Sequence, residues 1–483
     1  MTVTKVKPPV LKSKNLSWLP FKFDRLQQDQ VIVSNSVGEW LILNDLEFDQ
    51  LVGKSFSSEN LVRKLLAKHF IYRTNETAAL RLLPLKLATR NRQLGDGTGL
   101  HIFVVTLRCD HACEYCQVSR QNSRSTEFDM SEVDALSALL IAFSSPNPAI
   151  KIEFQGGESL LNFDLIKFIV LKAKELNQVH NKNLAFVIAT NLAMIEDHMI
   201  EFAGEHDIYF STSLDGAAEL HNQNRARPGK NSWELTINGI KRIRARLGND
   251  RVSALMTTTA ASLNYPEQII DSYVEHGFEE IFLRYLSPYG HAIKTGSHAK
   301  YDNQRWMKFY FEGLNYIIEL NKSGVNLTEA MASTYLKKML TNEPTTFVDM
   351  STPTGAGLGA LVYNYDGDVY SSDEGRMLKE MGDQTFKLGS VSTHNYQELM
   401  LTDVILDATE QSFAPSAPMC SDCSLEPFCG SDATVHHTLQ GDFVGYKPES
   451  PFCERTMTIV PYLMKKYSED EFCRDLFTRW ANR

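Results

Sequence analysis

No apolar run in the sequence is long enough to cross a membrane, and the first residues lack the apolar core of a signal peptide. With 49 Lys and Arg against 59 Asp and Glu, the chain also lacks the basic excess of nucleic-acid-binding proteins. We therefore expect a cytoplasmic protein whose partners include neither nucleic acid nor membrane. A chain of 483 residues is too long for one compact core, so its length predicts two to three domains.

Cysteine is also scarce, and its eight copies are clustered. Three lie between residues 109 and 116, four lie between residues 420 and 453, and Cys473 stands alone. Thiols stay reduced in a cytoplasmic protein, so such groups indicate metal binding rather than disulfides. Cys473 lies in an expected terminal helix, and we interpret it as a bystander.

The first group has the spacing C-x3-C-x2-C and directly follows an apolar run that predicts a strand; it consists of Cys109, Cys113 and Cys116. Thiolates this close on one loop can converge on a single inorganic centre. Three ligands would leave one iron of a four-iron cube open to a substrate. A zinc loop or a partial disulfide set is the alternative. Zinc sites, however, usually have paired C-x2-C knuckles with a fourth ligand nearby, and no further cysteine occurs before residue 420.

This motif resembles that of the radical S-adenosylmethionine (SAM) enzymes. The resemblance implies that the three cysteines hold a 4Fe-4S cluster whose fourth iron is chelated by SAM. It also implies reductive cleavage of SAM to a 5′-deoxyadenosyl radical, which abstracts a hydrogen from the substrate. Tyr115 matches the family's aromatic residue near the adenine, and a core tyrosine beneath the loop is the alternative.

Around this motif, short apolar strands alternate with amphipathic helices up to residue 290, which predicts a parallel sheet. The expected strands are 100–107, 149–154, 185–190, 208–214, 252–258 and 281–286. The expected helices are 130–143, 164–176, 195–204, 232–247 and 266–276. Six such units fit the open, TIM-type (β/α)6 partial barrel of the radical SAM core. We therefore predict an α/β fold with this core at residues 96–298.

Polar motifs follow the ends of these strands, where the functional residues of such barrels lie. The family resemblance implies that the G-G-E motif receives the amino group of SAM and that Arg225 pairs with the SAM carboxylate. The other residues listed next are implied to lie near the ribose, the adenine or the methionine end of SAM. The implied SAM-binding residues are Tyr115, Gly156, Gly157, Glu158, Thr190, Asn191, Ser213, Arg225 and Leu286. Arg227 is the alternative to Arg225, and a surface position is the alternative for both.

Residues 1–95 are expected to form a separate small unit with a hairpin at 31–43 followed by three helices. This pattern resembles the winged-helix peptide-recognition element of peptide-modifying radical SAM enzymes. In such elements a leader peptide adds a strand to the exposed hairpin edge and packs on a helix. A packing module without peptide binding is the alternative.

Residues 299–345 are expected to form a helical bridge, and residues 346–483 a domain with a hairpin and the second cysteine group. That group is Cys420, Cys423, Cys429 and Cys453. The domain resembles the SPASM (twitch-type) iron–sulfur domain, but Ser372 and Ala433 stand where a full SPASM domain carries cysteines. The resemblance therefore implies one complete auxiliary 4Fe-4S cluster and an empty first auxiliary position. A zinc knuckle is the alternative.

The resemblance is most specific to the His-Xaa-Ser system radical SAM maturases and runs over nearly the whole chain. It rests on strings such as Phe154-Gln-Gly-Gly-Glu-Ser-Leu-Leu-Asn162, Ala254-Leu-Met-Thr-Thr-Thr259 and Tyr365-Asp-Gly-Asp-Val-Tyr370. It implies a precursor peptide with a leader as substrate, and a second radical SAM protein of the same system as a further partner. We also expect a flavodoxin- or ferredoxin-like electron donor.

These observations predict an oxidoreductase that modifies a ribosomally made peptide of the His-Xaa-Ser type, through a crosslink or a related oxidation. The second cysteine group is the expected sink for the second electron, and Asp373 or Glu374 is a hypothetical general base, with exposed turn carboxylates as the alternative. Epimerisation needs a hydrogen donor, often a thiol, and no spare cysteine lies in the expected core. The alternatives are a peptide epimerase, a sulfatase-type formylglycine-forming maturase and a non-catalytic, zinc-bearing peptide-binding protein.

Overall fold

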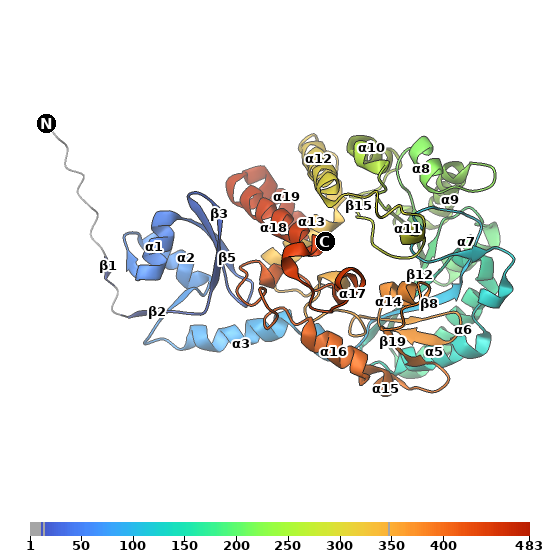
Figure 1. Ribbon diagram of the computed structural model, residues 1–483, viewed down its shortest axis with the longest axis horizontal. Coiled ribbons are helices and arrows are strands. Elements are labelled where there is room, and N and C mark those ends of the chain that lie inside the picture. The colour runs from blue at the N-terminus through green and yellow to red at the C-terminus, as the bar shows by residue number, and fades with distance from the viewer. Residues whose placement is uncertain (1–10, 13–14, 346–347) are drawn as a thin grey trace.

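The computed structural model describes residues 11–12, 15–345 and 348–483. A small N-terminal unit lies at one end, and a long helix joins it to a larger body built around one sheet (Figure 1). Among the described residues, no helix combines the length and the apolar character that a bilayer span needs.

The central sheet of the larger body has eight strands in the order β14-β13-β12-β11-β8-β17-β18-β19. They are β8 (Leu100–Thr106), β11 (Ala149–Gly156), β12 (Asn183–Thr190), β13 (Ile208–Ser213), β14 (Val252–Leu255), β17 (Ala360–Tyr363), β18 (Asp368–Tyr370) and β19 (Lys387–Ser390). The strands from β14 to β8 are parallel, as the alternating sequence pattern predicts. β17 then pairs in parallel with β8, and β18 and β19 follow in antiparallel fashion. The C-terminal hairpin therefore extends the sheet of the partial barrel.

The expected sixth barrel strand at 281–286 differs in the structure. Only β15 (Glu280–Ile281) is extended, and it pairs with β16 (Thr328–Glu329) instead of joining the main sheet. The backbone N–H of Leu283 donates to the Glu329 carboxylate at 3.2 Å, so a side chain takes the place of a neighbouring strand. The backbone N–H of Thr258 donates to the Arg284 carbonyl at 3.0 Å, which keeps this segment beside the end of β14.

The helices of the barrel cover the sheet with apolar faces, and their side chains form one large core with the strands. They are α5 (Glu132–Ser144), α6 (Phe163–His180), α7 (Asp197–Glu205), α8 (Ala218–Asn224), α9 (Ser232–Leu247) and α10 (Pro266–Glu275). Five of them lie within a few residues of the helices that the sequence predicts. The short α8 follows the fourth strand and was not expected.

The expected bridge contains two helices, α12 (Asn303–Lys322) and α13 (Ala330–Leu340), after the single turn α11 (His291–Lys294). The remaining helices are α14 (Asp373–Lys379), α15 (Tyr396–Met400), α16 (Asp403–Gln411), α17 (Ala433–Gln440), α18 (Pro451–Glu469) and α19 (Glu471–Ala481). Cys473 lies on α19 with its side chain fully buried in the large core.

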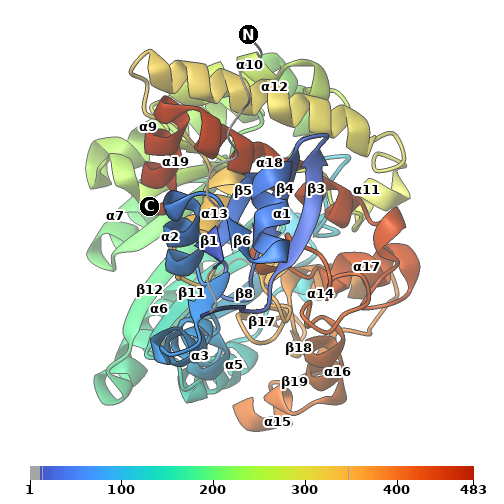
Figure 2. The same cartoon turned by 90° about the vertical axis from the view of Figure 1, so that its left-hand side faces the viewer.

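The N-terminal unit contains a three-stranded antiparallel sheet and two packed helices with a small core of their own. Its elements are β1 (Leu11–Lys12), β2 (Leu16–Trp18), β3 (Lys22–Gln27), β4 (Gln30–Ser34), β5 (Trp40–Asn44), α1 (Asp45–Gly53), β6 (Ser55–Phe56), α2 (Glu59–Ala67) and β7 (Ile71–Arg73). Asn44 caps α1 in a capping box with Glu47, as the sequence predicts. Figure 2 shows this unit in front of α13 and α18.

The third helix of this region, α3 (Ala78–Arg90), has no buried residue and acts as a connector to α4 (Gln93–Asp96) and β8. Lys86 of this helix forms an ion pair with Glu39 of the N-terminal unit at 2.7 Å. At its far end, Arg90 donates to the backbone carbonyls of Lys338 and Pro427 at 3.2 and 2.7 Å. The helix therefore ties the N-terminal unit to the larger body.

Candidate functional site

The first cysteine group lies on a loop that leaves the end of β8 through β9 (Arg108–Cys109), which pairs in parallel with β10 (Gln121–Asn122). The Arg108 side chain holds the base of this loop, since it donates to Asp129 and to the Leu161 carbonyl at 2.7 Å each. All three thiols are free and line one cavity of about 260 Å³. The loop thus presents three sulfur ligands to one space.

The two glycines of the G-G-E motif allow the end of β11 to press against this loop. A Cβ on Gly156 would lie 2.0 Å from the Thr106 carbonyl oxygen, and one on Gly157 would lie 2.3 Å from the Arg108 carbonyl oxygen. Both glycines also line the cavity. Only glycine fits this close approach of two backbones, so the pair shapes the cavity floor beside the cysteines.

Glu158 is buried and joins the ends of two strands. Its carboxylate accepts hydrogen bonds from the Thr190 hydroxyl at 2.6 Å and the Asn191 backbone N–H at 2.8 Å. Burial raises the pKa of Glu158 to about 7, although these hydrogen bonds oppose the shift. Glu158 does not line the cavity itself. Its hydrogen bonds instead fix Thr190 and Asn191, which do line the cavity.

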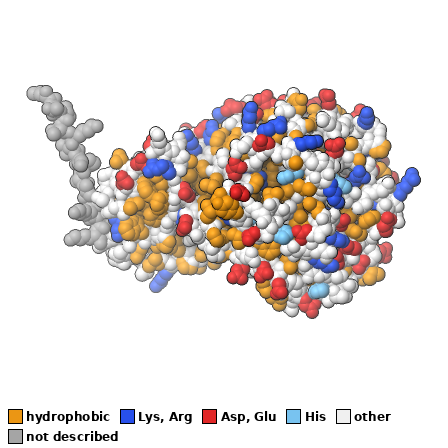
Figure 3. Space-filling view, in the orientation of Figure 1, with side chains coloured by type: hydrophobic (Ala, Val, Ile, Leu, Met, Phe, Trp, Pro, Cys, Tyr) orange, Lys and Arg blue, Asp and Glu red, His pale blue; other side chains and the backbone are white. Residues whose placement is uncertain are grey.

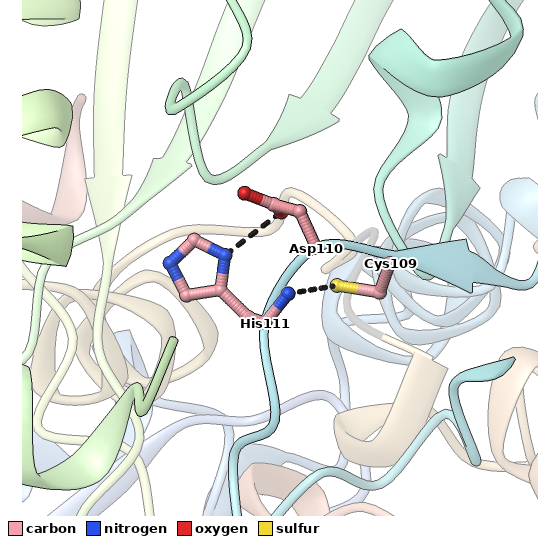
Figure 4. Close-up of side chains that lie close together, drawn as sticks. All are labelled: Cys109, Asp110 and His111. Atoms are coloured by element: carbon pink, nitrogen blue, oxygen red, sulfur yellow. Dashed lines mark hydrogen bonds and ion pairs between the residues drawn. The ribbon is translucent and has the colours of Figure 1, made fainter. Parts of the chain in front are cut away.

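Figure 4 shows a second set of contacts, made by Asp110 and His111 within the cysteine loop, and His111 also lines the cavity. The Asp110 carboxylate lies 2.8 Å from His111 Nδ1 and accepts from the Asn191 side-chain amide at 2.9 Å. His111 Nε2 lies 2.8 Å from the Ser232 hydroxyl. Cys109, Asp110 and His111 have ligand atoms within 4.8 Å of one another. Because both ring nitrogens of His111 have protein partners, we interpret this set as a support for the loop.

Arg225 lines the cavity and is fixed by a buried partner, Asp215. Its Nε and Nη2 atoms each lie 3.0 Å from a different Asp215 oxygen, and the Tyr115 hydroxyl donates to the same carboxylate at 2.8 Å. Burial alone would raise the pKa of Asp215, but the charge of Arg225 outweighs it and the pKa is lowered. The guanidinium also lies 5.5 Å from the centre of the Tyr115 ring. The network orients one cation toward the cavity.

The structure brings most of the sequence-predicted SAM residues to this cavity. Its lining includes Tyr115, Gly156, Gly157, Thr190, Asn191, Ser213 and Arg225. Leu286 is not part of the lining and packs behind Tyr115 and beside Ala292. Arg227 is also outside the lining and lies 3.4 Å from Asp110. Sequence reasoning missed Asp110, His111 and Asp215, although the first two lie within the C-x3-C spacing and Asp215 follows Ser213 by two residues.

The two predicted base residues begin α14 and differ in where they point. Ser372, at a position where the family pattern has cysteine, caps this helix through a hydrogen bond from the Gly375 N–H at 3.1 Å. Asp373 lines the cavity and pairs with Arg376 at 2.7 Å. Glu374 does not line it and lies 4.0 Å from Arg284, with a pKa raised mainly by burial. Neither carboxylate is an exposed turn residue.

The four thiols of the second cysteine group are free and lie near enough to influence one another's pKa. Burial raises the pKa of Cys429 to about 12; Lys338 opposes this, and the thiols of Cys423, Cys453 and Cys420 add to it. Lys338 donates to the backbone carbonyls of Cys429 and Met350. Four nearby thiols suit either an iron–sulfur cluster or zinc.

Residues 103–272 match the family model of the radical SAM superfamily. The chain carries a radical SAM domain. This confirms the predicted α/β partial-barrel fold, and it confirms the expectation of a radical SAM enzyme at the level of the domain.

The curated relatives vary in how much of the chain they share. The chain is 31% identical over 195 residues to an uncharacterized protein of Methanocaldococcus jannaschii, which covers 40% of this chain and 64% of that protein. A second relative, from Methanothermobacter thermautotrophicus, is also matched over 64% of its length, so both matches span less than two thirds of the relative. A cysteine-type anaerobic sulfatase-maturating enzyme of Clostridium novyi is 22% identical over 367 residues, or 72% of this chain and 90% of that one.

Two solved structures share the fold beyond the radical SAM domain. The structure of anSMEcpe with bound AdoMet superposes with a TM-score of 0.63 at 16% identity, covering 80% of this chain and 99% of that one. Streptococcus suis SuiB bound to its precursor peptide SuiA superposes with a TM-score of 0.55 at 14% identity, covering 92% and 100%. At these identities the likeness concerns the fold alone.

Proposed function

We propose that this chain is a radical SAM maturase that modifies a ribosomally made peptide. The observation that carries the proposal is that the free thiols of Cys109, Cys113 and Cys116 face the cavity that Arg225 and Ser213 also line. Three thiolates on one loop suit a 4Fe-4S cluster with one open iron. When bound there, the cluster and SAM together supply the radical that abstracts a hydrogen.

The residues around the cavity then bind and orient SAM. Arg225, held by Asp215, offers its cation to the SAM carboxylate, and the backbone around Gly156 and Gly157 meets the amino group. Tyr115 and Ser213 flank the nucleoside, with Leu286 packed behind the tyrosine. Glu158 keeps Thr190 and Asn191 at the cavity edge through the hydrogen bonds described above.

The substrate in this proposal is a His-Xaa-Ser type precursor whose leader binds the N-terminal unit. Within the described residues, β3 pairs only with β4, so its outer edge is open to an added strand. Hydrophobic side chains gather over this unit (Figure 3), and Phe23, Leu46 and Val52 are each about half or more exposed. An open edge beside apolar side chains suits an extended peptide segment.

The proposal divides the remaining chain by role. The N-terminal unit spans 1–95, the radical SAM core 96–298, the helical bridge 299–345 and the SPASM-like domain 346–483. The second cysteine group is proposed to hold one auxiliary 4Fe-4S cluster that takes the second electron of an oxidation. We place the reaction in the cytoplasm, with a flavodoxin- or ferredoxin-like donor and a second radical SAM protein of the same system as partners.

Asp373 is the better of the two proposed general bases. It faces the cavity, whereas Glu374 points toward Arg284. Arg376 orients the Asp373 carboxylate from the same helix through contacts of 2.7 and 3.2 Å. A D373N variant that still cleaves SAM but makes less peptide product would support this role, and full turnover of the peptide would contradict it.

A sulfatase-type maturase is the second candidate, because a relative of that name aligns over 72% of the chain. Ser372 and Ala433 weigh against it, since they replace cysteines of the full SPASM pattern and serve here as a helix cap and a buried helix residue. A peptide epimerase would need a hydrogen donor at the cavity. The lining holds no thiol besides the three of the loop among the described residues.

The decisive test is anaerobic coexpression of the chain with a His-Xaa-Ser precursor peptide, followed by the peptide's mass. A loss of about 2 Da is expected for a crosslink or a desaturation. The C109A/C113A/C116A variant should leave the mass unchanged. An unchanged mass in ordinary water together with deuterium uptake in heavy water would favour the epimerase instead. Purified protein without colour near ~400 nm would favour the zinc-bearing, non-catalytic alternative.

A further inference from the structure

One carboxylate in the cavity has no role in the function proposed above. Glu153 lies on β11, opposite Ile102 of β8 and Val187 of β12, at the inner face of the partial barrel. Its side chain lines the same cavity as the three cysteines and Asp373. Because it lies among side chains that we assign to the cofactor and the base, it faces the space left for the peptide residue.

The Glu153 carboxylate has only a neutral hydrogen-bond partner among the described residues. Gln155 donates from Nε2 to Oε1 at 2.7 Å, and no ion pair of the described residues includes Glu153. Its pKa is raised by burial; the Gln155 hydrogen bond and the charge of Lys151 oppose this, and Asp373 adds to it. Lys151 lies two residues earlier on the same face of β11, but it is exposed and forms no ion pair with Glu153 among the described residues.

Two other charged side chains of the lining are paired, while Arg120 and Arg284 also line the cavity and form no ion pair with Glu153 among the described residues. Arg225 is held by Asp215 through two contacts of 3.0 Å, and Asp373 is held by Arg376 at 2.7 Å. Glu153 is half-buried, and a carboxylate drawn out of water without a cation is costly because desolvation is not offset by an opposite charge. Such a group is therefore most readily explained by a cation that arrives with the substrate.

We propose that Glu153 is a specificity-determining residue that recognises a cationic side chain of the peptide, an imidazolium, ammonium or guanidinium group next to the carbon that loses its hydrogen. The inference rests on the proposed function, since it takes the cavity as the peptide site. It adds a charge requirement that the radical chemistry itself does not impose. Histidine, lysine and arginine are the side chains that meet it.

The experiment uses the cofactor-loaded full chain with SAM and a set of fluorescent peptides that are identical except at one position, which is His, Lys, Gln or Leu. Affinities are measured by fluorescence polarisation at pH 6, where the histidine peptide is largely protonated. The wild type should bind the Lys and His peptides at least about ten-fold more tightly than the Gln peptide, as a charge-assisted contact implies. E153Q should lose this difference and bind all four peptides with similar affinity.

Two variants act as controls. E201Q removes a carboxylate from the exposed side of α7 and should keep the wild-type preference. E153D keeps the charge and should keep the preference at reduced strength, which separates loss of charge from loss of folding. E201Q should also leave the formation of 5′-deoxyadenosine from SAM unchanged, since Glu201 lies outside the cavity lining.

The outcomes separate this inference from the proposed function. A charge preference that disappears in E153Q supports the role of Glu153. If no peptide is modified in the same experiments, that result counts against the maturase proposal and not against the role of Glu153. A wild type without any preference for the cationic peptides overturns the inference. The same preference in E153Q as in the wild type also overturns it.

Discussion

The two cysteine groups place the same ligand atom in opposite settings. The group at 109–116 lies on a loop that opens onto a cavity of about 260 Å³, beside charged and polar side chains. The group at 420–453 does not line that cavity and lies between α13, α18 and the N-terminal unit. Metal centres that react keep an open position and a cavity, whereas structural or electron-transferring centres are closed by protein ligands. This difference favours the proposed reactive role for the first group and the proposed supporting or electron-transferring role for the second.

The two groups are also held by different means. The first loop is held by residues of the barrel itself, through Arg108 and through the contact of Asn191 with Asp110. The second is held from outside, because Asp24 of β3 accepts from the Ser424 N–H at 2.8 Å and Lys22 pairs with Glu426 at 3.0 Å. The N-terminal unit that we propose to bind the leader thus contacts the loop between Cys423 and Cys429.

The largest expected effect comes from removing one group at a time. The C109A/C113A/C116A variant should lose SAM cleavage completely, because no other thiol of the described residues lines the cavity. The C429A variant should still release 5′-deoxyadenosine while its peptide product falls at least about ten-fold, since the electron sink is lost. Each variant should retain about four of about eight irons per chain. Equal loss of SAM cleavage in both variants would contradict the division between the groups.

A smaller effect is expected where the open site binds SAM. The Asp215 carboxylate pairs with Arg225 and accepts a hydrogen bond from the Tyr115 hydroxyl, and D215N removes its charge. Loss of one partner of a buried charge pair costs about 2–5 kcal/mol. The SAM dissociation constant of the loaded enzyme should therefore rise by about 30-fold or more. R227Q is the matched control, because Arg227 pairs outside the cavity with Asp110. The interpretation fails if R227Q weakens SAM binding as much as D215N does.

Local patterns predicted the barrel well, because each strand and helix carries its own apolar period. They failed at 281–286, where an apolar run suggested a strand. There the N–H of Leu283 donates to the buried Glu329 carboxylate instead of to a neighbouring strand. The pairing of β17 with β8 was also beyond reach, since it joins segments far apart in the sequence.

The candidate site shows the same limit. The cysteines and the G-G-E motif follow from spacing, and the structure brings them to one cavity. Asp215 and Glu153 did not stand out, because a carboxylate on a strand or turn gives no sequence sign of whether a cation lies beside it. Only the fold reveals that Asp215 has Arg225 as a partner and that Glu153 has only the neutral Gln155.

A pH effect is expected on the side of the second group, because α13 begins beside a buried carboxylate. Glu329 accepts from the Ala332 N–H at 2.7 Å and the Tyr310 hydroxyl at 2.8 Å, and burial raises its pKa from 4.5 to about 7. The folded chain thus holds a proton that the unfolded chain releases above pH 4.5, so this contribution to stability is present at low pH and is lost as pH rises through about 7. The contribution is of the order of 3 kcal/mol. Urea unfolding at pH 5 and pH 8 should show that the free energy of unfolding falls less in E329Q than in the wild type between these two values. An equal fall in both proteins would contradict the role of Glu329 in this pH dependence.

The smallest effect is expected at the contact between the N-terminal unit and the second group. The Lys22 and Glu426 side chains are 20% and 6% exposed, so K22A should destabilise the chain by about 1 kcal/mol, between the values for surface and buried pairs. It should also speed the release of iron from the second group to a chelator. R25A breaks the exposed Arg25–Asp45 pair on the same strand and should change neither quantity measurably. Iron release that is equally fast in K22A and R25A would show that the N-terminal unit does not help to hold the second cysteine group.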